Sequence, residues 1–116
     1  MLKQIEEIYD YLQNKKYKDI AVYDLSNEQQ SCNIMFIVSV TNQANNKKLA
    51  LQLMEDLKLL DYPEGFNKGE WIVFDLDEII IHCFVTSVRE KYNLDKLWKS
   101  KFIDMKKNKV EAKKKN

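Results

Sequence analysis

Carboxylates cluster in one short segment of the chain, at a spacing that could support metal chemistry. Asp75 and Asp77 are separated by a single leucine, and Glu78 follows directly. Alternate residues of a β-strand point to the same face, so two carboxylates at this spacing could share a divalent cation. If Leu76 and Asp77 instead form a tight turn, in which Asp77 tolerates a positive φ, the carboxylates do not share a strand face and have turn and surface roles.

Nucleotidyltransferases combine such a carboxylate pair with an upstream Gly-Ser turn that holds the triphosphate. Nothing like that turn precedes Asp75, because the nearest candidate is the segment 68–70, Lys-Gly-Glu. The chain also has no serine hydrolase elbow, Walker loop or dinucleotide-binding glycine motif. We therefore expect a protein that is not an enzyme and needs neither metal nor cofactor. The alternative is a metal-dependent nucleotidyltransferase, or a nucleotide-binding relative, that uses Asp75 and Asp77.

Two further side chains near this segment can make specific polar contacts. His82 is the only histidine and lies in an apolar run, where a hydrogen-bonded core or interface role is expected. Arg89 is the only arginine, and its planar fork suits a carboxylate. We expect a structural pair within the molecule, for which Asp75 or Glu78 are candidates, and the alternative is an acidic group of a partner.

Aromatic residues in the same region could form a surface for a partner protein. In a strand, Trp71 faces away from Ile72 and Phe74, so it points outward if those two residues line the core. Trp, Tyr and Arg dominate the energetic hot spots of protein interfaces. The candidate surface therefore contains Trp71, Tyr92 and Arg89. Trp98 could join it, although core packing accounts for Trp98 equally well.

Hydrophobic periodicity predicts the elements that must position these residues, in the order helix, strand, strand, helix, strand, strand, helix. The strand at 33–40 is apolar on both faces and should be central. The last two strands are joined by a tight connection and should be antiparallel, which indicates an α/β fold with a mixed sheet of about four to five strands flanked by helices. The predicted ranges are 2–14, 20–25, 33–40, 42–62, 70–75 and 78–85, followed by a short helix that begins at 86–87 and runs to about 92, with a further helical turn at 94–98.

Local signals suggest where the two later helices begin and end. Either Asn42 or Asn45 can cap the second helix, and Pro63 should end it. Ser87 and Glu90 have the spacing of a capping box, which would start the following helix.

Composition indicates one globular domain. The chain has 116 residues, of which 45% are hydrophobic and 32% charged, with only two glycines and one proline. These values exclude collagen-like and wholly disordered chains. No apolar run is long enough to cross a bilayer, and acidic residues interrupt the amino terminus where a signal peptide would be apolar. We therefore expect a cytoplasmic protein without membrane contact, in which Cys32 and Cys83 are free buried thiols.

Charge is distributed unevenly along the chain. Residues 1–98 carry 11 basic and 16 acidic side chains, whereas residues 99–116 carry eight lysines and two acidic residues. Apolar periodicity stops after Met105, so the chain divides into a domain at 1–105 and a Lys-rich, disordered tail at 106–116. The tail is either a solvated terminus or a weak, non-specific contact for RNA phosphates.

The segment from the Trp-led strand to the last tryptophan resembles the ribosomal silencing factor family, also called the RsfS or Iojap family. That family has a Trp-led strand, an Asp, a short turn, an aliphatic run ending in His-x-Phe, an Arg-x-x-Tyr and a closing Leu-x-x-Leu-Trp. The Glu-Gly pair at 64–65 also matches. The matching anchors are Trp71, Asp75, His82, Phe84, Arg89, Tyr92, Leu94, Leu97 and Trp98.

The resemblance implies an α/β domain shaped like a nucleotidyltransferase but without its activity. It also implies binding to the large ribosomal subunit, through its ribosomal protein number fourteen at the face that meets the small subunit. A bound factor would block subunit joining and repress translation. For partner binding we expect Trp71, Asp75, Glu78, His82, Arg89 and Tyr92. Family members often self-associate, so a homodimer is also expected to be possible.

Overall fold

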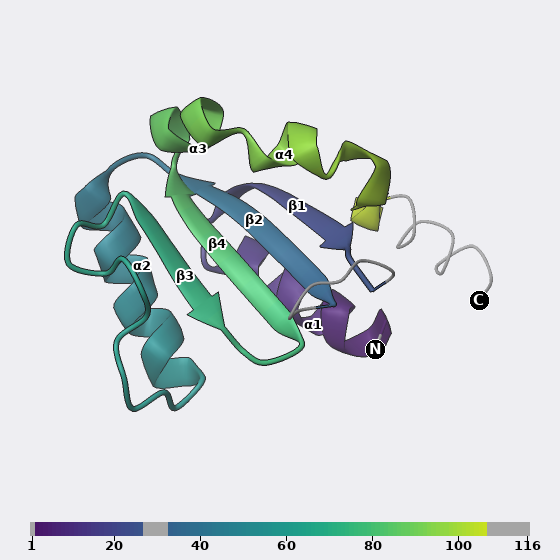
Figure 1. Ribbon diagram of the computed structural model, residues 1–116. Helices are drawn as coiled ribbons and strands as arrows, with labels where there is room; N and C mark the ends of the chain where they lie inside the picture. Colours follow the sequence, from purple (N-terminus) through teal and green to yellow (C-terminus); the bar gives the residue numbers. More distant parts are fainter. Residues whose placement is uncertain (1, 27–32, 107–116) are drawn as a thin grey trace.

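A five-stranded mixed sheet carries helices on both faces (Figure 1). The computed structural model describes residues 2–26 and 33–106. The strand order is β3-β4-β2-β1-β5, with β2 parallel to β4 and every other neighbouring pair antiparallel. The predicted α/β fold class is therefore confirmed. The elements are α1 (Leu2–Asn14), β1 (Lys18–Asp24), β2 (Ile34–Val40), α2 (Gln43–Asp56), β3 (Trp71–Asp75), β4 (Ile79–Val85), α3 (Thr86–Tyr92), α4 (Leu94–Leu97), a 3₁₀ turn (Lys99–Lys101) and β5 (Phe102–Ile103).

The predicted central strand, β2, is buried along its whole length, and its two faces belong to two hydrophobic clusters. Phe36 packs in the cluster that also contains Leu12 of α1 and Leu53 of α2. Ile37 points the other way, into a cluster with the partly buried Val88 of α3. The helices α1 and α2 therefore cover one face, and α3 and α4 cover part of the other (Figure 1).

The end of α2 corrects one expectation. We predicted that Pro63 would end this helix, but it ends at Asp56. Lys58 adopts a left-handed φ of 55°, and the N–H groups of Lys58 and Leu59 donate to carbonyls of the last helical turn, as in a Schellman motif. The chain leaves the helix before Leu60, which is 97% exposed and does not join the buried stripe.

Both predicted helix starts are confirmed, but the capping box predicted for the second of them is wrong. Asn42 caps α2, because its Oδ1 accepts a hydrogen bond of 2.8 Å from the N–H of Asn45. The helix α3 begins at Thr86, directly after β4, within the predicted start at 86–87, but the capping box predicted at Ser87 does not form, because the N-cap residue is Val85. There Thr86 uses its hydroxyl to donate to the carbonyl of Val40, which ties the helix to the end of β2.

The β3–β4 hairpin confirms the positive φ of Asp77, which is 73°. The turn lies one residue later than predicted, because the N–H of Leu76 bonds to the carbonyl of Ile79 and leaves Asp77 and Glu78 as the two turn residues. The Oδ1 atom of Asp75 accepts a hydrogen bond of 3.1 Å from the N–H of Asp77. This carboxylate therefore stabilises the turn.

The carboxyl-terminal region adds an element that the sequence did not predict. The short strand β5 pairs with β1 at the edge of the sheet. Of the tail that we predicted to be disordered, at 106–116, only Lys106 belongs to the described residues, so that prediction lies outside them. The prediction for Cys32 also lies outside the described residues. Cys83 is a buried free thiol, as predicted. None of the helices in the described ranges is long and apolar enough to cross a membrane.

Gly65 is required where the loop before β3 closes against the sheet. Its φ is 81°, and a Cβ atom there would lie 2.1 Å from the carbonyl oxygen of Trp71. The neighbouring Glu64 carbonyl accepts a hydrogen bond from the N–H of Val73, so this loop covers the outer edge of β3. The Glu-Gly pair at 64–65 therefore allows this loop to pack closely against β3.

We predict that Gly65→Ala lowers the free energy of unfolding by about 2 kcal/mol, through left-handed strain and the backbone clash. Gly69→Ala is the matched control, since Gly69 has a φ of 78° but its added Cβ would first meet the flexible side chain of Lys47, at 3.0 Å. Urea denaturation of both variants measures the difference. Equal losses would show that the contact with Trp71 is unimportant.

Candidate protein-binding surface

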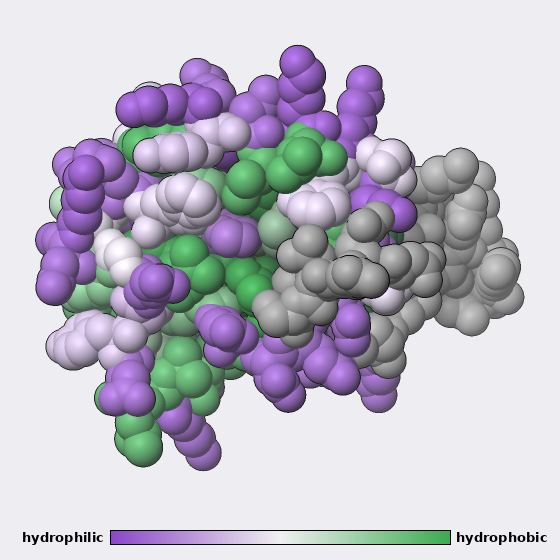
Figure 2. Space-filling view, in the orientation of Figure 1, coloured by the Kyte–Doolittle hydropathy of each residue, from purple (hydrophilic) through white to green (hydrophobic). Residues whose placement is uncertain are grey.

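Four aromatic rings lie together on the sheet face that α3 and α4 cover only in part, and three of them belong to predicted binding residues. Trp71 and Phe84 are cross-strand partners, and their rings stack with centroids 4.7 Å apart. The ring of Tyr92, at the end of α3, lies 4.9 Å from that of Trp71, and the His82 ring lies 5.8 Å away. We call Trp71, His82, Phe84 and Tyr92 the aromatic surface. Figure 2 shows this face, with hydrophobic side chains gathered over β3 and β4.

The alternation predicted for β3 explains this arrangement. Ile72 and Phe74 are buried in the cluster on the α1–α2 side, so Trp71 and Val73 must face the other way. Tyr92 remains 52% exposed. Within the aromatic surface Tyr92 is therefore exposed and Trp71 and His82 are partly exposed, whereas Phe84 is buried.

His82 is held in one defined state within the aromatic surface. The indole Nε1–H of Trp71 donates to His82 Nδ1 over 3.0 Å, which requires Nδ1 to be unprotonated. Burial lowers the pKa of His82 to about 4. His82 is therefore neutral at pH 7, carries its proton on Nε2, and orients the indole of Trp71, consistent with the predicted hydrogen-bonded role.

We predict that His82 titrates near pH 4 and that Trp71→Phe, which removes the donor and opens the packing, raises this pKa toward 6.5. Because the pKa of folded His82 lies below its ordinary value, this residue stabilises the fold above pH 6.5 and loses that contribution as the pH falls toward 4. Imidazole NMR signals measure the titration directly, since the chain has one histidine. A midpoint near 6.5 in the unsubstituted protein would contradict the buried geometry.

A cavity of about 430 Å³ lies beside the aromatic surface. Val73 and Ile80 form its apolar wall on the sheet, and the loop 59–64 forms the opposite wall. Leu60 and Tyr62 on that loop are 97% and 67% exposed. Exposed apolar side chains around a concave site are typical of a protein-binding surface.

Asp75 and Glu78 lie at the turn end of the hairpin, away from the aromatic rings. Asp75 has the same parity on β3 as Trp71, four residues along the strand, which places it about 13 Å away on the same face. It lines the cavity described above. Glu78 has an exposed side chain, and its carbonyl accepts hydrogen bonds from the N–H groups of Asn33 and Ile34.

Arg89 does not pair with either carboxylate that we had considered. Its Nε and Nη2 atoms donate to the two oxygens of Asp95, each over 2.9 Å. Its Nη1 donates to the carbonyl of Asp19 and to the hydroxyl of Ser39, over 2.6 and 2.8 Å. The expected pair within the molecule is therefore confirmed, but the candidates Asp75 and Glu78 were wrong. This side chain, only 13% exposed, ties α3 to α4, β1 and β2.

Asp95 is the centre of this internal network. Burial alone would raise the pKa of the Asp95 carboxyl, but hydrogen bonds from Arg89 and Tyr23 outweigh that effect and hold the pKa below its usual value. The Tyr23 hydroxyl donates to Asp95 Oδ1 over 2.6 Å. Burial and the nearby carboxylate in turn raise the pKa of Tyr23. Asp95 therefore stays ionised and paired at neutral pH.

Several residues that build this region were missed by the sequence analysis. Phe84 was identified only as an anchor of the family resemblance, whereas the hairpin register, in which it is the direct cross-strand partner of Trp71, would have placed it in the aromatic surface. Val73 and Ile80 follow from the same alternation. The pairing of Arg89 with Asp95 had only a weak signal, their separation of six residues across a predicted helix break.

The carboxylates considered for metal chemistry have turn and surface roles in the structure. Asp75 accepts from the turn backbone, and Asp77 is itself a turn residue. Within residues 2–26 and 33–106, no group of three or more His, Cys, Asp or Glu side chains is arranged to hold a metal ion.

Comparisons with known proteins agree with the fold and the motif spacing. The model of the family described as ribosomal silencing factor during starvation matches residues 1–116. A ribosomal silencing factor from Haemophilus influenzae is 30% identical over 98 residues, which cover 81% of this chain and 96% of that protein. A mouse protein named mitochondrial assembly of ribosomal large subunit protein 1 is 24% identical over 107 residues, covering 86% of this chain and 47% of its own length.

A solved structure gives the same result in three dimensions. The crystal structure of a Chromobacterium violaceum protein has a TM-score of 0.73 and 26% sequence identity, and the match covers 84% of this chain and 86% of that one. The five-stranded sheet, the Trp71–Phe84 hairpin and the match along all 116 residues point the same way. The chain belongs to the ribosomal silencing factor family.

Proposed function

We propose that this protein binds the large ribosomal subunit through its ribosomal protein number fourteen, at the face that meets the small subunit, and so blocks subunit joining and represses translation. Family membership supports a role in ribosome silencing. The name of the mouse relative links that protein to the large subunit. The aromatic surface on the sheet, in which Tyr92 is exposed and Trp71 and His82 are partly exposed, is the observation that carries the proposal.

The aromatic surface and the adjoining cavity have the features of a protein interface. Trp71 and Tyr92 offer large rings at low cost in side-chain entropy, and such residues dominate interface energetics. Leu60 and Tyr62 extend the apolar area on the far side of the cavity. An ordinary interface buries about 800 Å² per partner, which a patch of this kind can supply.

Acidic side chains around the cavity suit a basic partner. Asp61, Glu64 and Asp75 all line it, and no basic residue does. A lysine or arginine of a ribosomal protein could place its aliphatic stem against Val73 and Ile80 and its charge near these carboxylates. Residues 1–98 are also acidic as a whole, which accelerates encounter with a basic surface in a salt-sensitive manner.

No chemical step is needed for silencing by this route. A 13.9 kDa body occupies a volume that two rigid ribosomal surfaces would otherwise share. Two macromolecules cannot dock while that volume is filled. Inhibition should therefore follow the fraction of large subunits that carry the protein.

Co-sedimentation with purified large subunits tests the proposed partner. We expect saturable binding of one protein per subunit, and competition by purified ribosomal protein number fourteen. Large subunits depleted of that protein are the control and should bind much less. Equal binding to depleted and complete subunits would overturn the assignment of the partner.

A further inference from the structure

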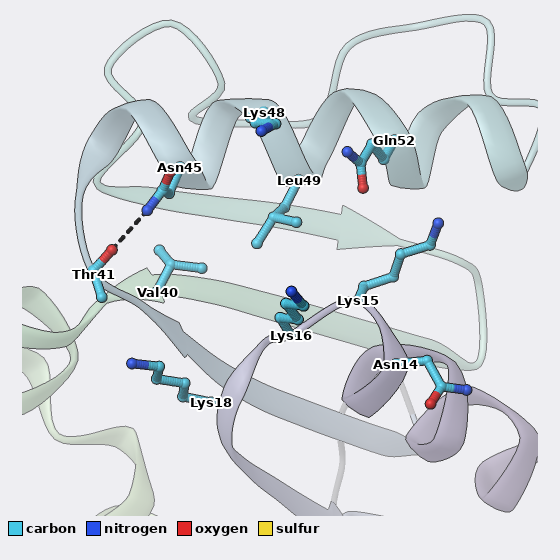
Figure 3. A pocket seen from close by; sticks show the side chains of 10 residues that line it. All are labelled: Asn14, Lys15, Lys16, Lys18, Val40, Thr41, Asn45, Lys48, Leu49 and Gln52. Carbon is cyan, nitrogen blue, oxygen red and sulfur yellow. Dashed lines mark hydrogen bonds between the residues drawn. The ribbon is translucent and has the colours of Figure 1, made fainter.

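A second cavity, on the opposite side of the sheet from the aromatic surface, is lined by lysines. It has a volume of about 550 Å³ and lies where the ends of α1 and β2 meet the start of β1 and α2 (Figure 3). Val40 and Leu49 give it an apolar floor and belong to the hydrophobic cluster of the α1–α2 face. The cavity therefore stays accessible when a partner covers the aromatic surface.

Four lysines line this cavity, namely Lys15, Lys16, Lys18 and Lys48. Lys15 forms an ion pair with Asp56, at 3.3 Å. Among the residues that the structure describes, the other three make no ion pair. Residues 1–98 contain only 11 basic side chains and are acidic overall, so this concentration of unpaired positive charge is a local exception.

The remaining lining residues add hydrogen-bond donors and a favourable dipole. Asn14 and Gln52 contribute amide groups, and Asn45 donates to the Thr41 hydroxyl over 2.7 Å (Figure 3). Thr41 directly follows β2, and α2 begins two residues later, so the positive end of the 14-residue helix is adjacent. Ligands of α/β proteins commonly bind at the carboxyl ends of parallel strands. This cavity lies at the carboxyl end of β2, which is parallel to β4.

The volume and the lining of the cavity favour a small anion over a nucleic acid as its ligand. Its volume falls within the range of about 300–1,000 Å³ that is usual for small-molecule sites. Single-stranded RNA sites combine positive charge with aromatic platforms for the bases, and no aromatic residue lines this cavity. Mobile ammonium groups around an apolar floor suit a phosphate chain attached to a less polar body.

We propose that this cavity binds a small molecule carrying two or more phosphate groups, of the class of nucleoside di- and triphosphates. Lys16, Lys18 and Lys48 contact the phosphates, and Leu49 and Val40 contact the remainder of the ligand. The site is separate from Asp75 and Asp77, and the inference does not depend on the proposed ribosomal function.

Isothermal titration calorimetry of the full chain with ATP and with inorganic tripolyphosphate tests this site. We expect one binding site per chain, and at least tenfold weaker binding in Lys16→Glu/Lys48→Glu. The matched control is Lys58→Glu/Lys96→Glu, which changes the net charge by the same amount. Lys58, like Lys16, has a left-handed backbone conformation, and Lys96, like Lys48, lies in a helix. The control should bind within twofold of the unsubstituted protein, and thermal unfolding should show that both variants are folded.

Three results would overturn the proposal. The first is no saturable binding of either compound, and the second is an equal loss in both double variants, which would indicate non-specific attraction to charge. The third is a short single-stranded RNA that binds more tightly than ATP and depends on Lys16 and Lys48, which would assign the cavity to RNA. Large-subunit binding by Lys16→Glu/Lys48→Glu is measured in parallel, so failure here is distinguishable from failure of the ribosomal function.

Discussion

Replacing Arg89 by alanine is expected to lower the free energy of unfolding by about 3 kcal/mol, although this residue lies beside a proposed binding surface. Removing one member of a largely buried pair leaves the other charge poorly solvated. In this case Asp95 would keep only Tyr23 as a side-chain donor, and Ser39, which is 1% exposed, would lose its contact with Arg89. Urea denaturation at neutral pH measures the loss.

Two further variants show whether the ion pair is responsible. Asp95→Asn keeps an acceptor for Tyr23 but removes the charge, so Arg89→Ala/Asp95→Asn should lose less than the sum of the single changes. Lys91→Ala, at an exposed position on the same helix, should change stability by about 0.5 kcal/mol or less. A loss below about 1 kcal/mol in Arg89→Ala would contradict the structural role assigned to the network.

Acid should weaken the same network. The folded Asp95 carboxyl has a pKa below its usual value, so its contribution to stability is present at neutral pH and is lost as the pH falls through that lowered pKa. Arg89→Ala should therefore show a weaker dependence of stability on pH in the acid range than the unsubstituted protein.

Replacing Trp71 by alanine is expected to weaken binding to the large subunit by about 30-fold, or about 2 kcal/mol, as for an aromatic hot spot. The change removes the ring that stacks on Phe84 and contacts Tyr92. It also removes the donor to His82, so part of the effect comes from disorder of the neighbouring side chains. Co-sedimentation with purified large subunits measures the affinity.

Tyr92→Ala separates binding from folding. This ring is 52% exposed, so its loss should leave thermal unfolding nearly unchanged while binding weakens about tenfold. Phe102→Ala is the matched control, because Phe102 is 54% exposed but lies on β5, at the opposite edge of the sheet from β3. If Phe102→Ala weakens binding as much as Tyr92→Ala, the aromatic surface is not the interface.

Much of the fold could be predicted because hydrophobic patterns report burial directly. The two apolar parities of β2 indicated a central strand, and the short connection after β3 indicated an antiparallel pair. Asp77 was correctly assigned a positive φ, since a tight turn needs one. These signals are local, and the sheet in the structure satisfies each of them.

The errors arose where a residue adopts a conformation that its type disfavours, or where contacts distant in the sequence decide the structure. The early end of α2 depends on Lys58 adopting a left-handed conformation, which its residue type does not favour. The capping box expected at Ser87 and Glu90 is absent because Thr86, which is hydrogen-bonded to β2, is already the first helical residue. A two-residue strand such as β5 has no periodicity of its own and forms only because β1 offers an edge.

The candidate surface was predicted in part. Trp71, His82 and Tyr92 were identified from their residue types and lie together in the structure. Arg89 was identified by the same reasoning but is engaged inside the molecule. Residue type shows which side chains can make strong contacts, whereas only the tertiary structure shows which of them are already occupied.

Subunit joining in the presence of this protein tests the central claim most directly. Purified large subunits are saturated with the protein, small subunits are added, and the mixture is separated on a density gradient. We predict that the two subunits sediment apart with the unsubstituted protein or Phe102→Ala, and that about tenfold more Tyr92→Ala is needed to keep them apart to the same extent. Joining at the normal rate while the large subunit is saturated with the unsubstituted protein would contradict a steric mode of silencing.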